Sequence, residues 1–273
     1  MDDDAPVPLA DAAAVEPDRE GRYLVNLAAQ FTVLGRPHGG YLQCVMANAA
    51  LASASDAGAS HLHATAVTTN FISAPAVGPA VLDTRVRRVG RGASFVHVTM
   101  SQDDLVTTEA LVTLGVLKET SRLRYQSSPP PQIAPRDECI DLPTHEVVSF
   151  RRSLDLRGDP ASHHWWIGDA GPAEIKLWMK LTDEGSPWDA WSLHFALDSV
   201  PPATLPLGST GWVPSLQLTT YVRRVPSSEW LRARQWCVVV ADDLVDERCE
   251  LFDDRNELVA SASQLAMVRF AQA

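Results

Sequence analysis

The chain of 273 residues is 45% hydrophobic and has a formal net charge of −11 at neutral pH. This length suffices for one large domain or two small ones, and the acidic balance argues against a general binder of nucleic acids or anionic membranes. The acidic start Met1-Asp2-Asp3-Asp4 is unlike a signal peptide, no apolar run reaches the length of a membrane span, and the four widely spaced cysteines fit a reducing compartment. We expect a cytoplasmic protein with neither a membrane nor a nucleic-acid partner.

The first half of the chain predicts one long helix among several strands. Residues 1–20 are acidic and rich in Ala and Pro, which predicts disorder. The run at 42–55 is apolar and rich in Ala without strand-like alternation, which indicates a helix buried on most of its surface. Runs rich in β-branched residues between turn residues predict a meander after this helix. Strands are expected at 22–31, 64–72, 80–89, 94–101 and 105–117.

A glycine-rich turn, Gly35 to Tyr41, precedes the predicted helix. We do not expect its glycines to begin the helix themselves. They allow a ligand to approach the free N–H groups of the helix N-terminus, where the helix dipole favours negative charge. His38, Gly39, Gly40 and Tyr41 are therefore candidate substrate-binding residues, and the N–H of Gly40 or Tyr41 is a candidate donor to an oxyanion. The alternative is a tight turn without a ligand.

The second half repeats this order of elements after a Pro-rich linker at 121–145. A strand is expected at 176–180 and a helical run at 190–199. Further strands are expected at 215–223, 232–241, 247–252 and 258–270.

Two short internal matches indicate a duplication. Val67–Pro75 resembles Leu218–Pro226 at an offset of 218 − 67 = 151, and Asp104–Val106 resembles Glu257–Val259 at an offset of 257 − 104 = 153. Because both matches lie in the same order within the same strand pattern, we predict two fused repeats, 21–120 and 146–273.

A glycine turn of the PHGGYL type before an Ala-rich helix that an antiparallel sheet wraps resembles the hotdog fold. The duplicated order of elements resembles the double-hotdog acyl-CoA thioesterases of the type II or medium-chain kind, although the glycine turn occurs only in the first repeat. The resemblance covers nearly the whole chain outside the linker and the first residues. It implies an α+β double hotdog, in which two sheets each wrap one long helix and join edge to edge as a pseudo-dimer. It also implies hydrolysis of acyl-CoA without a cofactor or metal, and a homo-oligomer, a dimer of double hotdogs.

The resemblance implies three catalytic residues in the second repeat. They are Asp198 on the helix, Ser215 at the start of the next strand and Gln264 in the closing strand. Thioester hydrolysis needs a base for a water molecule and groups that orient it, which a carboxylate beside an apolar patch and two neutral hydrogen-bonding side chains can provide. Gln217 stands where many relatives have Asp, and we count it as a substrate-binding candidate.

Two of these residues could instead have purely structural roles. Asp198 could simply be the residue that ends its helix, and Ser215 could be an ordinary residue at the start of its strand. Gln264 is harder to explain in this way, because it shares a strand face with apolar residues and needs a hydrogen-bond partner there. The offsets align Ser215 with Ala64 and Gln264 with Leu111, so we expect one active site per chain.

Other functions remain open at the level of sequence. The main alternative is a non-catalytic acyl-CoA-binding protein, and a weaker one is a dehydratase that pairs His194 with Asp198. The sequence contains no GxSxG motif, which argues against an α/β-hydrolase. His163-His164 has no further ligand residues at the spacing of a metal site. A basic cluster consists of Arg85, Arg87, Arg88 and Arg91. Its side chains could bind the phosphates of coenzyme A, but a solvent-exposed strand face is the simpler interpretation.

Overall fold

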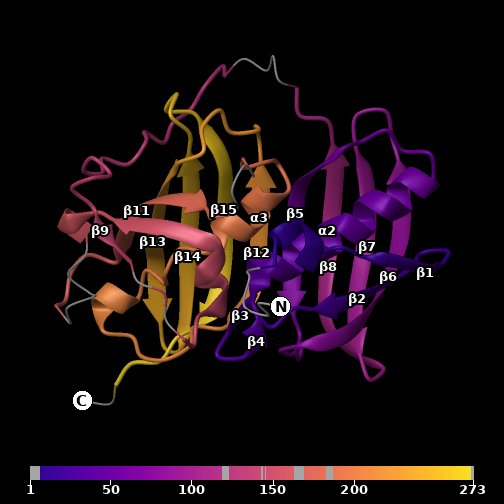
Figure 1. Cartoon of the computed structure of the whole chain (residues 1–273), viewed down its shortest axis with the longest axis horizontal. Coiled ribbons are helices and arrows are strands. Elements are labelled where there is room, and N and C mark those ends of the chain that lie inside the picture. The colour runs from indigo at the N-terminus through magenta and orange to yellow at the C-terminus, as the bar shows by residue number, and fades with distance from the viewer. Residues whose placement is uncertain are drawn as a thin grey trace, which may run out of the picture.

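The computed structural model describes residues 7–118, 123–142, 144, 146–162, 169–182 and 187–271. Within them, one antiparallel sheet of 13 strands runs through the molecule, and β3 with β4 forms a separate two-stranded ribbon. The order in the large sheet is β1-β2-β6-β7-β8-β5-β12-β15-β14-β13-β11-β10-β9. The first half of the chain therefore builds one side of the sheet and the second half the other (Figure 1).

The elements of the first half are α1 (Leu9–Ala12), β1 (Glu16–Arg19), β2 (Arg22–Leu27), β3 (Thr32–Val33), β4 (Arg36–Pro37), α2 (Gly39–Asp56), β5 (His63–Phe71), β6 (Gly78–Val89), β7 (Ser94–Gln102) and β8 (Leu105–Gly115). Those of the second half include β9 (Ile140–Asp141), β10 (Leu154–Gly158), β11 (Glu174–Leu181), α3 (Ser192–Leu197), β12 (Ser215–Val222), β13 (Leu231–Ala241), β14 (Leu244–Phe252) and β15 (Leu258–Met267). Short 3-10 helices lie at Ser149–Ser153, Pro160–Ser162 and Leu205–Leu207.

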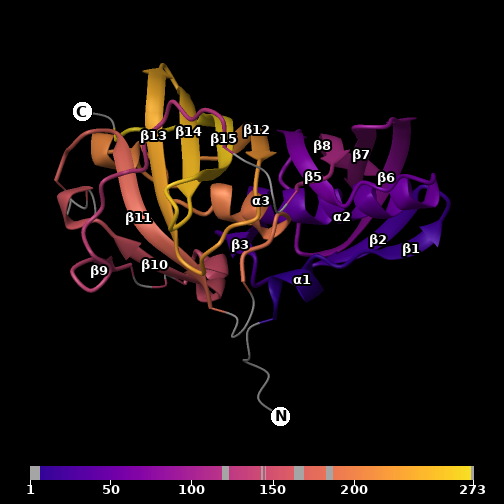
Figure 2. The same ribbon diagram turned by 90° about the horizontal axis from the view of Figure 1, so that it is seen from above.

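Helix α2 lies on the concave side of the first half (Figure 2). It packs against β5 to β8 on one side and against α3 on the other, and the side chains from Tyr41 to Ala47 are buried. The small Ala and Gly residues of this helix let both neighbours approach closely, which explains its composition. The predicted long helix is thus present, but it begins at Gly39. The expectation that the glycines would not begin the helix was wrong, because His38 caps the N-terminus by accepting a hydrogen bond from the Tyr41 N–H.

Helix α3 is much shorter than α2. The helical run expected at 190–199 is limited to Ser192–Leu197, with Trp191 and Asp198 as its caps. Pro201 and Pro202 follow shortly afterwards and prevent a longer helix. The prediction of one long helix in each repeat was therefore wrong for the second half.

The two halves of the sheet meet where β5 pairs with β12. The register is centred on Thr68 opposite Thr219, and these two positions are 219 − 68 = 151 residues apart, the offset of the longer sequence match. Beneath this joint, the buried side chains of Gln43 and Thr220 connect the halves, since Thr220 Oγ1 donates to Gln43 Oε1 at 2.8 Å. His194 Nδ1 lies 2.8 Å from the same hydroxyl.

Disorder was expected for residues 1–20, but helix α1 and strand β1 lie within residues 7–20, and residues 1–6 lie outside the described part of the chain. Leu9 and Ala12 of α1 are buried, and β1 pairs with β2. The Tyr41 hydroxyl donates to the Ala12 carbonyl at 2.6 Å, so the segment packs against the start of α2. Three expected strands also end earlier, at Leu27, Gly115 and Met267.

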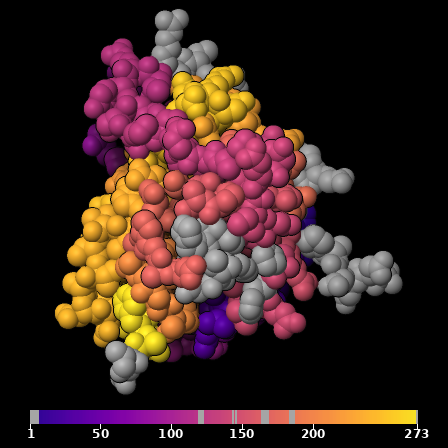
Figure 3. Space-filling model, turned by 90° about the vertical axis from the view of Figure 1, so that its left-hand side faces the viewer, coloured from indigo at the N-terminus to yellow at the C-terminus, as the bar shows by residue number. Residues whose placement is uncertain are grey.

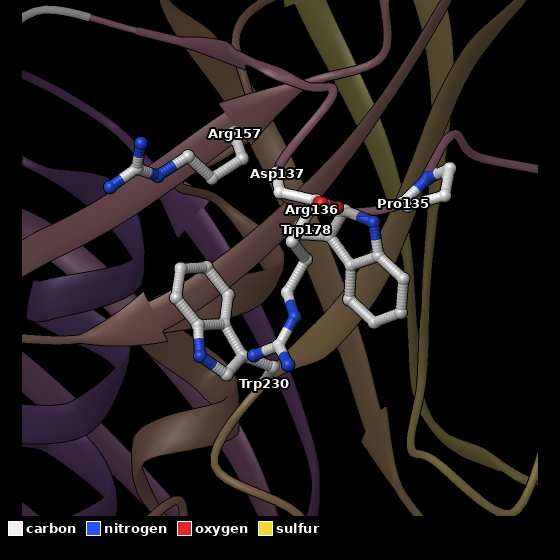
Figure 4. Close-up of a pocket in the computed structure, with 6 residues that line it drawn as sticks. All are labelled: Pro135, Arg136, Asp137, Arg157, Trp178 and Trp230. Atoms are coloured by element: carbon white, nitrogen blue, oxygen red, sulfur yellow. The ribbon is translucent and has the colours of Figure 1, made fainter.

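The described part of the linker lies across the outer face of the second half, where Figure 3 shows it in magenta. Ser128 donates to Glu250 of β14 at 2.6 Å, and Trp178 Nε1 of β11 donates to the Ala134 carbonyl at 3.0 Å. The Arg136 guanidinium lies 5.8 Å from the Trp178 ring and 5.1 Å from the Trp230 ring (Figure 4). These three side chains line a shallow hollow of the outer face, where the two cation–π contacts hold the linker.

Candidate active site

A cavity of about 570 Å³ is lined by residues from both halves of the chain. Most of its wall is apolar, and the polar groups that reach it are few, as in pockets that bind small molecules. Its apolar lining includes Leu42, Phe71, Leu142, Phe150, Trp212 and Met267. His38 and Gly39 from the first half and Asp198, Ser215 and Gln264 from the second half all reach this cavity. The structure thus brings together residues that the sequence separates widely.

Asp198 ends α3 and is held by hydrogen bonds from the other half. Its Oδ2 accepts from the Gly40 N–H at 2.7 Å and lies 3.1 Å from His38 Nε2. His38 Nε2 also lies 2.8 Å from the Asp198 carbonyl oxygen. Only 9% of the Asp198 side chain and 5% of the His38 side chain are exposed, so this contact is shielded from solvent.

The partners of His38 indicate its tautomer. Its Nδ1 accepts from the Tyr41 N–H at 3.4 Å, so in the neutral ring the proton belongs on Nε2, which then donates to Asp198. The ring packs on Phe150 and Phe195, with centroids 4.2 and 5.4 Å away. His38 therefore both caps α2 and orients the carboxylate at the end of α3.

Burial raises the pKa of the Asp198 carboxyl above its ordinary value, while His38 and the Gly40 N–H lower it. These effects oppose one another because burial disfavours the carboxylate and the two partners favour it. The burial effect is the larger, so Asp198 is a stronger base than an exposed aspartate and remains well oriented.

The two glycines of the turn are required for this close approach. A Cβ on Gly39 would lie 2.9 Å from Asp198 Oδ2 and 2.9 Å from Phe71 Cζ. A Cβ on Gly40 would lie 2.8 Å from Asp198 Cβ and 2.9 Å from the His194 carbonyl oxygen. Since no real Cβ tolerates such contacts, only glycine allows α2 to begin against the end of α3.

The N–H groups of this turn, which were expected to face the substrate, mostly have partners within the protein. The Gly40 N–H donates to Asp198 and the Tyr41 N–H to His38, so neither is open for an oxyanion. Tyr41 is fully buried, with its hydroxyl bonded to Ala12 and Ala28, and is a core residue. Gly39 lines the cavity, and its N–H has no acceptor within the described residues.

Ser215 and Gln264 lie side by side on β12 and β15, where Gln264 Nε2 donates to Ser215 Oγ. This hydrogen bond supplies the partner that an inward-facing Gln needs. Gln217 is different, because it is exposed and donates to Asn70 Oδ1 at 3.1 Å on the outer face. Gln217, which was expected to bind substrate, does not line the cavity.

The residues expected for other functions do not reach Asp198. His194 Nε2 lies 3.0 Å from the Ala64 carbonyl oxygen and its Nδ1 contacts Thr220, so the expected His194–Asp198 pair is absent from the described residues. Burial lowers the pKa of His194 to about 4, which keeps it neutral.

The remaining charged and metal-type residues add no site. The four arginines of the basic cluster are exposed and lie outside the cavity, in agreement with a solvated strand face. Among the described residues no group of His, Cys, Asp and Glu could hold a metal, and His163-His164 lies outside them. No helix in the described part of the chain is long and apolar enough to cross a membrane.

Sequence analysis missed one acid of the cavity, Glu247. It lies on β14 and is only 2% exposed. A signal was present, because Val245, Glu247, Cys249 and Leu251 alternate along one face of the strand. The strand was expected to begin at Glu247, which concealed this alternation.

The aligned counterpart of Gln264 in the first half also needs correction. Leu111 is 61% exposed on the outer face, whereas Gln264 points inward. In the symmetric register, Val112 opposite Val67 corresponds to Gln264 opposite Leu218. The first half therefore has Ala64 and Val112 in the places of Ser215 and Gln264.

Comparison with known proteins shows the family of this chain. The family model of the acyl-CoA thioesterase N-terminal domain matches residues 27–115, and the model of the C-terminal domain matches residues 127–268. The chain belongs to the acyl-CoA thioesterase family. This thioesterase, a hydrolase of thioester bonds, is 28% identical to an uncharacterized protein of Mycobacterium tuberculosis over 89% of both chains.

Solved structures show the fold of this thioesterase. A protein of Thermobifida fusca assigned as a thioesterase II is 29% identical, with a TM-score of 0.86 over 95% of this chain and 97% of that one. A protein of Alicyclobacillus acidocaldarius with the hotdog fold has a TM-score of 0.82 at 19% identity, over 98% of this chain and 100% of that one. The expected hotdog fold is confirmed.

Proposed function

We propose that this thioesterase hydrolyses acyl-CoA by means of a water molecule that Asp198 activates and that Ser215 and Gln264 orient. The observation that supports this most is the position of Asp198. It is a buried carboxylate on the wall of a largely apolar cavity, held by donors from the opposite half. Such a carboxylate is both basic and fixed in direction, as a general base must be.

The reaction follows from these roles. Asp198 removes a proton from water as the water oxygen attacks the carbonyl carbon of the thioester. The carbonyl oxygen becomes an oxyanion, for which the Gly39 N–H at the helix N-terminus is our candidate donor. When the tetrahedral intermediate collapses, the bond from carbon to sulfur breaks, and the thiolate takes up the proton that Asp198 removed from water, which regenerates the carboxylate. The products are the carboxylic acid and free coenzyme A.

Release of free thiol from a panel of acyl-CoAs, from acetyl to palmitoyl and aromatic, tests this proposal. We expect at least one of them to be hydrolysed without added metal or cofactor. Asp198→Asn should lower kcat by about two or more orders of magnitude, the usual scale for loss of a general base. Asp189→Asn, which alters an acid before α3 that lies outside the cavity, should not.

Two results would contradict the proposal. Wild-type turnover by a well-folded Asp198→Asn variant would remove Asp198 from the reaction. The absence of thiol release from every acyl-CoA of the panel would favour the alternative of an acyl-CoA-binding protein without turnover.

We also propose that residues 21–120 and 146–273 are two copies of one unit, joined as a pseudo-dimer with one active site. The symmetric register about Thr68 and Thr219 supports this arrangement. We further propose a dimer of such chains in the cytoplasm. Light scattering coupled to size-exclusion chromatography would test the assembly, since a single-chain mass at micromolar concentration would contradict it.

A further inference from the structure

Glu247 is a buried acid that the reaction proposed above leaves without a role. It lies on the inward face of β14, directly opposite Gln264 of β15 in the strand pairing. Its side chain lines the same cavity as Asp198, Ser215 and Gln264. A carboxyl group in such a place costs stability unless it is well bonded, which makes its contacts informative.

Among the described residues, the groups that donate hydrogen bonds to the Glu247 carboxyl are all neutral. The Ala203 N–H donates to its Oε1 at 2.7 Å, and Gln235 Nε2 donates to its Oε2 at 3.1 Å. The Thr204 N–H also favours the ionised form. Ala203 and Thr204 belong to the segment that leaves Asp198 and forms part of the cavity wall. Glu247 thus fastens that segment to the sheet.

The groups that titrate around Glu247 do not neutralise it. They are Asp198 at the end of α3, Cys237 on β13 and Cys249 on its own strand, while β15 contributes the neutral Gln264. His38 and Arg151 lie elsewhere on the cavity wall. Within the described residues no cation is within ion-pair distance of Glu247. Burial, followed by the charge of Asp198, raises the pKa of Glu247 to about 7.

The interaction between two charges acts on both partners equally. If the negative charge of Asp198 disfavours ionisation of Glu247, then the negative charge of Glu247 favours proton uptake by Asp198 to the same extent. Proton uptake by Asp198 is the step that activates water in the proposed reaction. An ionised Glu247 therefore assists the base.

We propose that Glu247 is a positioning residue of this thioesterase. Its carboxyl group holds the segment after Asp198 by accepting hydrogen bonds from the backbone N–H groups of that segment. When Glu247 is ionised, its charge also makes Asp198 a stronger base. The inference rests on the proposed role of Asp198. It assigns to Glu247 no contact with the substrate and no covalent step.

The test compares kcat of wild type and Glu247→Gln between pH 6 and pH 8 on one acyl-CoA that the enzyme hydrolyses. Gln keeps an acceptor oxygen for the backbone N–H groups but has no charge. The deficit of the variant should therefore grow with pH, by on the order of tenfold across this range, as wild-type Glu247 ionises. Asp246→Asn removes the same charge from the neighbouring position on the opposite face of β14, and its effect should not depend on pH.

A second measurement needs no turnover. In protein labelled with ¹³C at the glutamate carboxyl carbons, one signal should titrate near pH 7, and in Asp198→Asn its midpoint should fall because the neighbouring charge is gone. This titration decides the matter if Glu247→Gln does not fold.

The inference is overturned by a deficit that stays constant or shrinks as the pH rises. It is also overturned if no glutamate titrates above pH 6, or if the midpoint does not respond to Asp198→Asn. A fully active Asp198→Asn variant would instead refute the proposed function, and the ¹³C titration would still report whether the two carboxyls interact.

Discussion

At the scale of single residues, the hydrogen bond between Gln264 and Ser215 joins two of the three groups assigned to the reaction. We expect Ser215→Ala and Gln264→Ala each to lower kcat by about fivefold, because a neutral hydrogen bond contributes about 1 kcal/mol. Their effects should not add, since each substitution already breaks the same contact. Steady-state kinetics of both single variants and the double variant checks this. A double variant with the product of the two losses would mean that the residues act independently.

If Asp198 is the base, we expect His38 to influence the pH at which it works. The imidazole lowers the pKa of Asp198 and therefore favours the carboxylate. In His38→Phe, which keeps the ring against Phe150, the pKa of Asp198 should rise. Because the ionised carboxylate is the working form, the acid limb of kcat against pH should move to higher pH.

The control for this experiment is His97→Phe, since His97 lies on β7 away from the cavity. An acid limb that stays in place in His38→Phe, or moves to lower pH, would show that His38 does not stabilise the carboxylate.

The sequence placed Asp198, Ser215 and Gln264 at one cavity through family resemblance, but it did not show what holds Asp198. His38 and Asp198 lie 160 positions apart, and no local pattern reports a contact over that distance. The glycines of the turn were recognised as important for a different reason. Their hydrogen atoms leave room for α3, and the N–H of Gly40 is used by the protein itself.

At the scale of elements, the contact between α2 and α3 depends on Gly40. A methyl group there would lie 2.8 Å from Asp198 Cβ and 3.0 Å from Phe195 Cα, so Gly40→Ala should force the helices apart. We expect a loss of about 1–3 kcal/mol in the free energy of unfolding, as for other overpacked cores, together with lower turnover. Urea unfolding measures the first effect.

Gly92→Ala is the matched substitution, because a Cβ at Gly92 would meet nothing within 4 Å and its backbone is not in the left-handed region. It should leave stability nearly unchanged. Equal losses in the two variants would mean that the close approach at Gly40 is not what the glycine provides.

Element boundaries were harder to predict than element types. The strands of the meander follow from their β-branched residues, and α2 follows from its apolar, Ala-rich run. By contrast, α1 and β1 are structured only because α2 and β2 are there to pack and pair with, as the buried Leu9 shows. Composition alone does not include such tertiary contacts, which override local propensity.

At the scale of the whole molecule, Thr220 lies beneath the joint between the halves, next to the central pair Thr68 and Thr219. Its hydroxyl contacts both Gln43 and His194, all three of which are buried. Thr220→Val keeps the shape but leaves those partners with one bond fewer, so we expect a loss of about 1–3 kcal/mol in the free energy of unfolding.

Thr219→Val is the control. The Thr219 side chain lies on the opposite face of β12 from Thr220, and its hydroxyl donates to Thr68 of β5. Thermal unfolding of both variants should show a clearly lower midpoint only for Thr220→Val. Similar midpoints would indicate that the polar contacts beneath the joint contribute little to holding the halves together.

The central position of β5 affects synthesis of the protein. On the ribosome, β5 is complete at Phe71, but its partner β12 begins only at Ser215, which is 215 − 71 = 144 residues later. At about 5–20 residues per second, roughly 7–29 s pass between the synthesis of β5 and that of its partner strand. During that interval the nascent chain has a free sheet edge, the kind of surface on which unfinished chains associate with one another. Yield in the cell should therefore depend on the rate of translation of the linker and second half, and on chaperones that bind the chain before β12 emerges.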